Sequence, residues 1–125
     1  MESKYHFSFE ELKVYQKAIE YGEVVHKQLN SFPKIEDYGL SSQFARAADS
    51  IAFNIAEGSG SSDASFLNYL RIARDSSREC VAATRKAYLR EYISFEESEK
   101  NRAMLVEINK MLSSLMKYLK NKPNP

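Results

Sequence analysis

The sequence contains few cysteines, which cross-link small extracellular proteins, and few glycines and prolines, which interrupt helices. Its 125 residues include one cysteine, Cys80, four glycines, three prolines and no tryptophan. A single cysteine excludes an intrachain disulfide framework, which is typical of a reducing compartment. Two of the three prolines, Pro123 and Pro125, stand where they cannot interrupt a helix. So few helix breakers favour long helices over many short strands.

Long apolar runs and an excess of one charge are also missing. No stretch of about 18 uncharged apolar residues occurs, so the sequence predicts no membrane span. The first residues, Met1 to His6, lack the apolar core of a signal peptide, and we therefore expect a cytoplasmic protein. Because 18 Lys and Arg stand against 17 Asp and Glu, the net charge of +1 does not by itself indicate a nucleic-acid partner.

The apolar residues that are present recur at three- and four-residue steps, which is typical of amphipathic helices. The pattern predicts helices at about residues 9–31, 40–57, 63–92 and 95–121. The connections between them are short, so successive helices should run antiparallel. The sequence therefore predicts an all-α fold, an antiparallel up-down-up-down four-helix bundle that forms a single domain over residues 1–125.

Local signals mark the ends of these helices. Ser8 with Glu11, and Ser94 with Glu97, have the spacing of capping boxes, in which each side chain accepts a hydrogen bond from a free backbone amide. Gly58 stands where a helix often ends with a positive φ. We therefore expect the first helix to begin after Ser8, the second to stop at Gly58 and the fourth to begin after Ser94.

Each predicted helix has a face that should point into the core. These faces consist of Leu12, Tyr15, Ile19, Gly22, Val25 and Leu29; Leu40, Phe44, Ala47 or Ala48, Ile51 and Ile55; Phe66, Leu70, Ala73, Ser77, Cys80, Thr84 and Ala87; and Leu105, Ile108, Leu112, Leu115 and Leu119. The last helix also carries Met104, Met111 and Tyr118 on a flank. This flank predicts either a second contact surface or a broad core-facing stripe.

Several stretches resemble the four-helix bundle proteins encoded in intervening sequences of bacterial 23S ribosomal RNA genes. They are Phe9 to Ala18, Phe32-Pro33, Glu36 to Gln43, Ala47 to Ile51, Asn54 to Gly58, Phe66 to Leu70 and Ala73 to Glu79. Accessory proteins of diversity-generating retroelements are similar to the same family. The resemblance covers nearly the whole chain, and Asn54 to Gly58 is its most specific part.

The resemblance implies a bundle that assembles into a closed ring, typically a homopentamer, in a family not known for catalysis. The retroelement relatives are basic and are thought to bind nucleic acid and a reverse transcriptase. This sequence departs from the more basic members in two ways. Ala45 stands where a second arginine often precedes Arg46, and the net charge is close to neutral. Both departures weaken the inference of nucleic-acid binding.

Arginines of the third predicted helix are the best candidates for function. Arg71, Arg74, Arg78 and Arg85 fall within about 60° of one another at 100° per residue, and Arg46 and Lys86 extend this surface. Guanidinium groups suit phosphate, since each can donate two hydrogen bonds at once. Three interpretations stay open: a subunit interface or ion-pair network in which Asp75 pairs with Arg71 or Arg78, a solvated face, or an RNA- or DNA-binding surface.

Three further polar residues predict a structural network. Asn54 and Glu57 come late in the second helix, at the edge of its apolar stripe, where an unpaired polar group is costly. We expect both to bond to a facing helix, through an arginine of the third helix for example, and we include Glu79 of that helix in the network. A catalytic carboxylate would need a second carboxylate or a histidine nearby, and no such spacing occurs.

No other pattern predicts chemistry. A bundle di-metal site needs two Glu-x-x-His motifs, and Glu23 to His26 is the single copy, so His6 and His26 should be surface residues. Cys80 should be a buried structural thiol. We predict no catalytic residues, metal, cofactor or small-molecule substrate. The sequence favours a non-enzymatic homo-oligomer that acts as a ring-forming interaction or scaffold protein, with an RNA- or DNA-binding accessory protein as the alternative.

Overall fold

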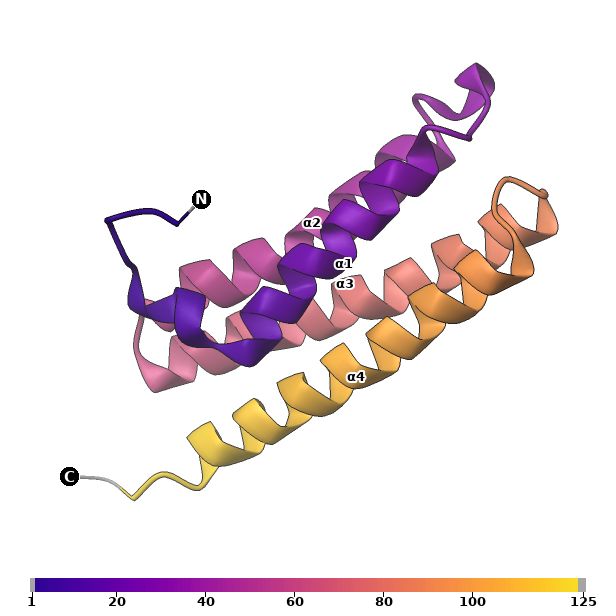
Figure 1. The fold of residues 1–125 in the computed structure, drawn as a ribbon. Coiled ribbons are helices and arrows are strands. Elements are labelled where there is room, and N and C mark those ends of the chain that lie inside the picture. The colour runs from indigo at the N-terminus through magenta and orange to yellow at the C-terminus, as the bar shows by residue number, and fades with distance from the viewer. Residues whose placement is uncertain (1, 124–125) are drawn as a thin grey trace.

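Four α-helices and two short 3-10 turns contain most of residues 2–123, the part of the chain that the computed structural model describes. The helices are α1 (Lys13–Leu29), α2 (Leu40–Ser59), α3 (Asp63–Leu89) and α4 (Phe95–Lys120), and the turns are Ser8–Glu11 and Lys34–Glu36. This range contains no strand. Successive helices run antiparallel (Figure 1), so the predicted all-α, up-down-up-down bundle is confirmed. The predicted domain also includes Met1, Asn124 and Pro125, which lie outside the described residues.

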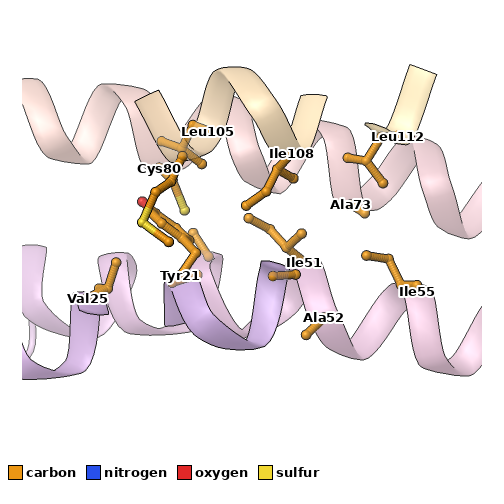
Figure 2. Close-up of a cluster of buried hydrophobic side chains, with 14 of the residues drawn as sticks. Tyr21, Val25, Ile51, Ala52, Ile55, Ala73, Cys80, Leu105, Ile108 and Leu112 are labelled. Atoms are coloured by element: carbon orange, nitrogen blue, oxygen red, sulfur yellow. The ribbon is translucent and has the colours of Figure 1, made fainter. Parts of the chain in front are cut away.

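The core lies along the axis of the bundle, where every helix contributes one face. The helices pack in a cycle, with α1 against α2, α2 against α3, α3 against α4, and α4 against α1. Figure 2 shows Ile51 and Ile55 of α2 facing Ile108 and Leu112 of α4 across this core. The faces predicted for α2 and α3 are buried throughout, and that of α4 is buried except for the half-buried Leu115. Heptad-like spacing therefore identified the buried side of three helices.

The flank of α4 belongs mostly to the core. Met104 is buried, and Met111 is half-buried and packs against the core, whereas Tyr118 is exposed. Of the two interpretations of this flank, the broad core-facing stripe is therefore confirmed for the two methionines. None of the helices within residues 2–123 combines the length and apolar character needed to cross a membrane.

The first helix differs from its prediction at its start and in its buried face. Leu12 is extended (φ −67°, ψ 121°), so α1 begins at Lys13 and the preceding residues form a separate 3-10 turn. The predicted capping box between Ser8 and Glu11 does not form. Instead the Glu10 carboxylate accepts a hydrogen bond from the Phe7 N–H at 3.0 Å. Sequence pattern placed the start of the helix too early because a 3-10 turn uses the same acidic first-turn residues as an α-helix.

The buried face of α1 is rotated by about one position from the predicted stripe. Ile19 is 40% exposed. The residues that α1 buries are Val14, Ala18, Tyr21, Gly22, Val25 and Gln28. Two of these, Ala18 and Gln28, carry little hydrophobic signal, so the larger apolar side chains beside them shifted the predicted centre of the stripe.

The predicted end of α2 at Gly58, with a positive φ, is wrong. The helix continues to Ser59, and no glycine in the described range has a positive φ. Instead Gly58 is buried against α3, where an added Cβ would lie 2.6 Å from Tyr69 Cβ and 2.9 Å from Phe66 Cδ1. Its missing side chain is what lets the end of α2 approach the start of α3.

The other helix ends follow recognised caps. Ser94 and Glu97 form the predicted capping box of α4, with backbone–side-chain hydrogen bonds of 2.9 and 3.0 Å. At the end of α3, Glu91 has a φ of 62°, and the Tyr92 N–H donates to the Ala87 carbonyl at 2.9 Å. This is a Schellman motif, which stops α3 three residues before the predicted end.

A pair of buried amides joins α1 to α4, the two helices farthest apart in sequence. The Gln28 amide donates to Asn101 Oδ1 at 2.8 Å, and Asn101 Nδ2 donates back to Gln28 Oε1 at 2.8 Å. Asn101 Nδ2 also lies 3.4 Å from Thr84 Oγ1 of α3. Because unpaired amides are costly in a core, this pairing fixes one register of α4 against α1.

Replacement of Gly58 by alanine should destabilise the protein although alanine is the better helix former. We expect Gly58→Ala to lower the free energy of unfolding by about 1–3 kcal/mol, because the new methyl group overlaps Tyr69 and Phe66. The matched control is Gly60→Ala, whose Cβ would meet nothing closer than the Glu57 carbonyl at 4.0 Å. Urea unfolding followed by circular dichroism measures both. Equal stability of the two variants would contradict the packing role of Gly58.

Loss of one member of the buried amide pair should cost more than loss of both. Asn101→Ala leaves the Gln28 amide buried without its partner and opens a cavity, so we expect a loss of about 2–4 kcal/mol. Gln28→Leu with Asn101→Leu removes both polar groups and should recover most of that loss. Thermal unfolding of the three proteins compares them, and a single variant that is no less stable than the double one would refute this assignment.

Candidate functional site

The arginines predicted for function lie on the outer side of α3. Arg71, Arg78 and Arg85 are exposed and Arg74 is half-buried, and the opposite side of the helix is packed in the core. We call these four residues the arginine face. Their alignment is a consequence of the three- and four-residue steps between them, which keep the side chains on one side of the helix.

None of these four arginines has a carboxylate within 4.0 Å among the described residues. The pairing of Asp75 with Arg71 or Arg78, which one of the three interpretations allowed, does not form among the described residues. Arg71 donates instead to the side-chain oxygen of Asn68 at 2.8 Å. Arg74 keeps its Nε buried without a hydrogen-bond partner. The arginine face consequently carries four positive charges, none of which forms an ion pair with a carboxylate of the described residues.

Arg46 and Lys86 line a different site at the end of the bundle that holds the α1–α2 and α3–α4 connections. An open pocket of about 490 Å³ lies there. Its lining, which we call the cationic pocket, consists of Glu36, Tyr38, Gly39, Leu40, Gln43, Arg46, Glu79, Lys86 and Arg90. The sequence did not single out Arg90, because it stands at the end of α3, in the Schellman turn.

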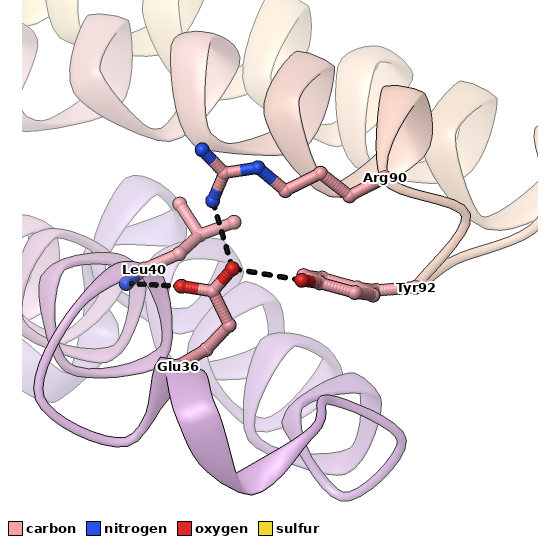
Figure 3. Close-up of polar contacts among 4 residues, drawn as sticks. All are labelled: Glu36, Leu40, Arg90 and Tyr92. Carbon is pink, nitrogen blue, oxygen red and sulfur yellow. Dashed lines mark hydrogen bonds and ion pairs between the residues drawn. The ribbon is translucent and has the colours of Figure 1, made fainter.

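Glu36 organises this end of the molecule. Its Oε2 accepts from Arg90 Nη1 at 2.9 Å and from the Tyr92 hydroxyl at 2.8 Å, and its Oε1 accepts from the Leu40 N–H at 3.2 Å (Figure 3). The hydrogen bond from Tyr92 is the main reason that the pKa of Glu36 is lowered, and the same bond raises the pKa of Tyr92. The carboxylate thus ties the start of α2 to the α3–α4 turn.

The predicted polar network forms only in part. Asn54 bonds within its own helix: its Nδ2 donates to the Ser50 carbonyl and to Ser50 Oγ, both at 2.8 Å. Ser50 Oγ in turn accepts from Ser76 Oγ of α3 at 2.9 Å, so a serine pair provides the link between helices. Glu57 and Glu79 are exposed and form no ion pair in the described part of the chain. The bonds expected between Glu57 and a facing helix are absent there.

Two grooves run along the sides of the bundle. The first, of about 440 Å³ between α1 and α2, is lined by Ala18, Ile19, Gly22, Glu23, His26, Ala48, Asp49, Ala52 and Phe53, and we call it the acidic groove. The second, of about 410 Å³ between α3 and α4, is lined by Val81, Arg102, Leu105, Val106, Asn109 and Lys110, and we call it the basic groove. Because the helices pack in a cycle, the α1–α2 side lies opposite the α3–α4 side.

Each groove has an exposed apolar side chain and charges of one prevailing sign. Phe53 is 65% exposed in the acidic groove, and Val106 is 54% exposed in the basic groove. In the acidic groove Asp49 bonds to His26 at 3.1 Å. The basic groove contains Arg102 and Lys110 and no carboxylate. Pattern reasoning missed both surfaces, because each combines residues from two helices.

The remaining candidates for chemistry are isolated. Cys80 is buried beside Tyr21 (Figure 2), and burial raises the pKa of the Cys80 thiol to about 12. A thiol with so high a pKa stays protonated and is a poor nucleophile. His6 and His26 are exposed, as predicted. Within residues 2–123, no three His, Cys, Asp or Glu side chains lie close enough together to hold a metal ion.

Comparisons with known proteins agree with the fold. The sequence model of the 23S rRNA-intervening sequence protein family matches residues 10–114. Among solved structures, the chain is similar to a protein of unknown function from the S23 ribosomal protein family of Bacteroides thetaiotaomicron VPI-5482, with 29% identity and a TM-score of 0.77. That similarity covers 83% of this chain and 98% of the other. No curated protein matches the chain.

Proposed function

Because the chain belongs to the 23S rRNA-intervening sequence protein family, we propose that it is a non-enzymatic interaction protein that assembles with copies of itself into a ring. The observation that carries the proposal is the pair of grooves on opposite sides of the bundle. Each has an apolar side chain that a solvated monomer gains nothing by exposing, and their charges are complementary.

The two grooves favour a head-to-tail contact between subunits. Val106 and the cations of one subunit's basic groove would meet Phe53 and the carboxylates Glu23 and Asp49 of the next subunit's acidic groove. A contact between unlike surfaces repeats from subunit to subunit, and it produces a ring when the rotation closes. The family resemblance implies five subunits for such a ring.

The size of the molecule supports two contacts per subunit. The chain exposes 8197 Å² of surface, and a stable interface takes about 800 Å² from each partner. Two such contacts fit on opposite sides without overlap. The Cys80 thiol is buried and its pKa is raised, so it is a poor nucleophile, which agrees with the non-enzymatic part of the proposal.

A charge placed at the centre of the basic groove should separate the subunits. Val106→Asp would set a carboxylate against Glu23 and Asp49 of the neighbour, so we expect a mass near the 14.4 kDa of one chain at micromolar concentration. Multi-angle light scattering should find the unmodified protein at a multiple of that mass. The matched control is Ile72→Asp, at a 48% exposed apolar residue of α3 outside both grooves, which should leave the assembly intact.

Two outcomes of this experiment contradict the proposal. A mass of 14.4 kDa for the unmodified protein would exclude assembly at that concentration. An assembly that Val106→Asp leaves intact and Ile72→Asp disrupts would place the contact on another surface.

The arginine face favours a second function, the binding of structured RNA or DNA. Its three exposed members, Arg71, Arg78 and Arg85, lie on one side of α3 and have no carboxylate within 4.0 Å in the described range, so their guanidinium groups are available to phosphates. The two functions are compatible, because a ring would bring several weak basic surfaces onto one nucleic acid.

Removal of two exposed arginines should weaken nucleic-acid binding and its salt dependence. For Arg78→Ala with Arg85→Ala, we expect weaker RNA binding at about 50 mM salt and a salt slope reduced by about 1–2, one phosphate contact for each side chain. Lys117→Ala with Lys120→Ala removes the same charge from the end of α4 and should change neither the RNA affinity nor the salt slope. Fluorescence anisotropy with a labelled RNA hairpin measures this, and equal losses in both pairs would refute a specific role of the arginine face.

A further inference from the structure

The cationic pocket brings together cations from three segments of the chain. Arg46 comes from α2, Lys86 from the last turn of α3 and Arg90 from the residue that follows α3. Arg46 and Lys86 have no carboxylate within 4.0 Å among residues 2–123. Their charges are therefore available to an anion that enters the pocket.

Arg90 is held in place but is not fully used. Its Nη1 donates to Glu36, and Figure 3 shows the other terminal nitrogen of the guanidinium group pointing away from the carboxylate. The Glu36 carboxylate also accepts hydrogen bonds from the Tyr92 hydroxyl and the Leu40 N–H, so with Arg90 it accepts from three donors. Glu36 thus holds the Arg90 guanidinium group in one orientation and leaves its other N–H donors free. A cation held in place in this way forms a preorganised site for an anion.

Two further features of the pocket narrow the class of ligand. Tyr38 is among the lining residues and its side chain is fully exposed, at 101% of the reference area. A fully exposed aromatic side chain at the edge of the pocket offers a free face for stacking. Glu79 is the second carboxylate of the lining and has no cation within 4.0 Å in the described range. It can accept hydrogen bonds from the ribose hydroxyl or base amino groups of a nucleotide, and inorganic phosphate has neither a sugar nor a base.

We propose that the cationic pocket is a nucleotide-binding site, in which Arg46, Lys86 and Arg90 bind a phosphate and Tyr38 stacks on the base. Its volume of about 490 Å³ lies within the range of about 300–1,000 Å³ that is usual for small-molecule sites. The α2 helix begins at Leu40 in the pocket lining, and its N-terminus adds partial positive charge. Cations beside an aromatic platform are the combination by which proteins hold single nucleotides of an unpaired strand.

Two kinds of ligand contain this chemistry: a free nucleotide, and one nucleotide within a single-stranded nucleic acid. Isothermal titration calorimetry with AMP, with inorganic phosphate and with a short single-stranded oligoadenylate distinguishes them. Binding of AMP as tight as that of the oligonucleotide assigns the pocket to a free nucleotide. Tighter binding of the oligonucleotide assigns it to a strand. Failure of both AMP and the oligonucleotide to bind at about 50 mM salt overturns the proposal.

Matched variants test which residues act. Arg46→Ala with Lys86→Ala should weaken AMP or oligonucleotide binding at least about tenfold, and Lys117→Ala with Lys120→Ala should leave it unchanged. Tyr38→Ala should weaken nucleotide binding about tenfold without affecting inorganic phosphate, and Tyr38→Phe should restore it. Thermal unfolding checks that each variant is folded, and these side chains are exposed.

The test separates this pocket from the arginine face, on which it does not depend. If the oligonucleotide binding is lost in Arg78→Ala with Arg85→Ala but survives Arg46→Ala with Lys86→Ala, the pocket proposal is wrong and the arginine face is the site. The reverse result supports the pocket. Nucleotide binding that is unchanged in Tyr38→Ala also overturns the proposal, because stacking is then not part of it.

Discussion

The close packing of α2 against α3 is the constraint on which the rest of the structure depends. Gly58 has no Cβ where Phe66 and Tyr69 of α3 approach, and a Ser50–Ser76 hydrogen bond joins the same two helices farther along. With α2 and α3 held together, their remaining core faces can be covered only by α1 and α4. The Gln28–Asn101 amide pair then fixes how those two helices meet. The outward positions of α3 are thereby left to the arginine face.

Much of this arrangement could be predicted from sequence, and the exceptions have physical causes. Three- and four-residue steps identified the buried sides of α2, α3 and α4 correctly, through leucine and isoleucine in α4 and mostly through small residues in α3. For α1 the pattern was displaced by about one position, because Ala18 and Gln28 are buried without being strongly hydrophobic. Gly58 was misread because a glycine at the end of a helix has two uses, a left-handed cap or close packing, and only the neighbouring helix decides between them.

The candidate sites were harder to predict than the fold. Periodicity placed the arginines of α3 on one face, but it could not exclude the ion pair with Asp75, which depends on side-chain conformations. It also grouped Arg46 and Lys86 with that face, whereas they line the pocket that Glu36 and Arg90 complete. Surfaces assembled from two or three helices, such as both grooves, leave no periodic signal in any one of them.

These surfaces divide the molecule in a way that suits an assembly. The grooves lie along the two sides of the bundle, and the cationic pocket lies at the end where the α1–α2 and α3–α4 connections meet. Side-to-side association would therefore leave the same end of every subunit free, and sites of modest affinity would be repeated around a ring. Repetition of this kind raises the overall affinity for a long ligand without any new contact.

The claim that unlike grooves join neighbouring subunits is tested most directly by mixing two variants. Val106→Asp damages the basic groove and Phe53→Arg damages the acidic groove, so each protein alone should have the 14.4 kDa mass of one chain. In an equimolar mixture, the intact acidic groove of the first meets the intact basic groove of the second. Native mass spectrometry should then find a species of at least twice that mass that contains both variants. A mixture that stays at the mass of single chains would contradict the account.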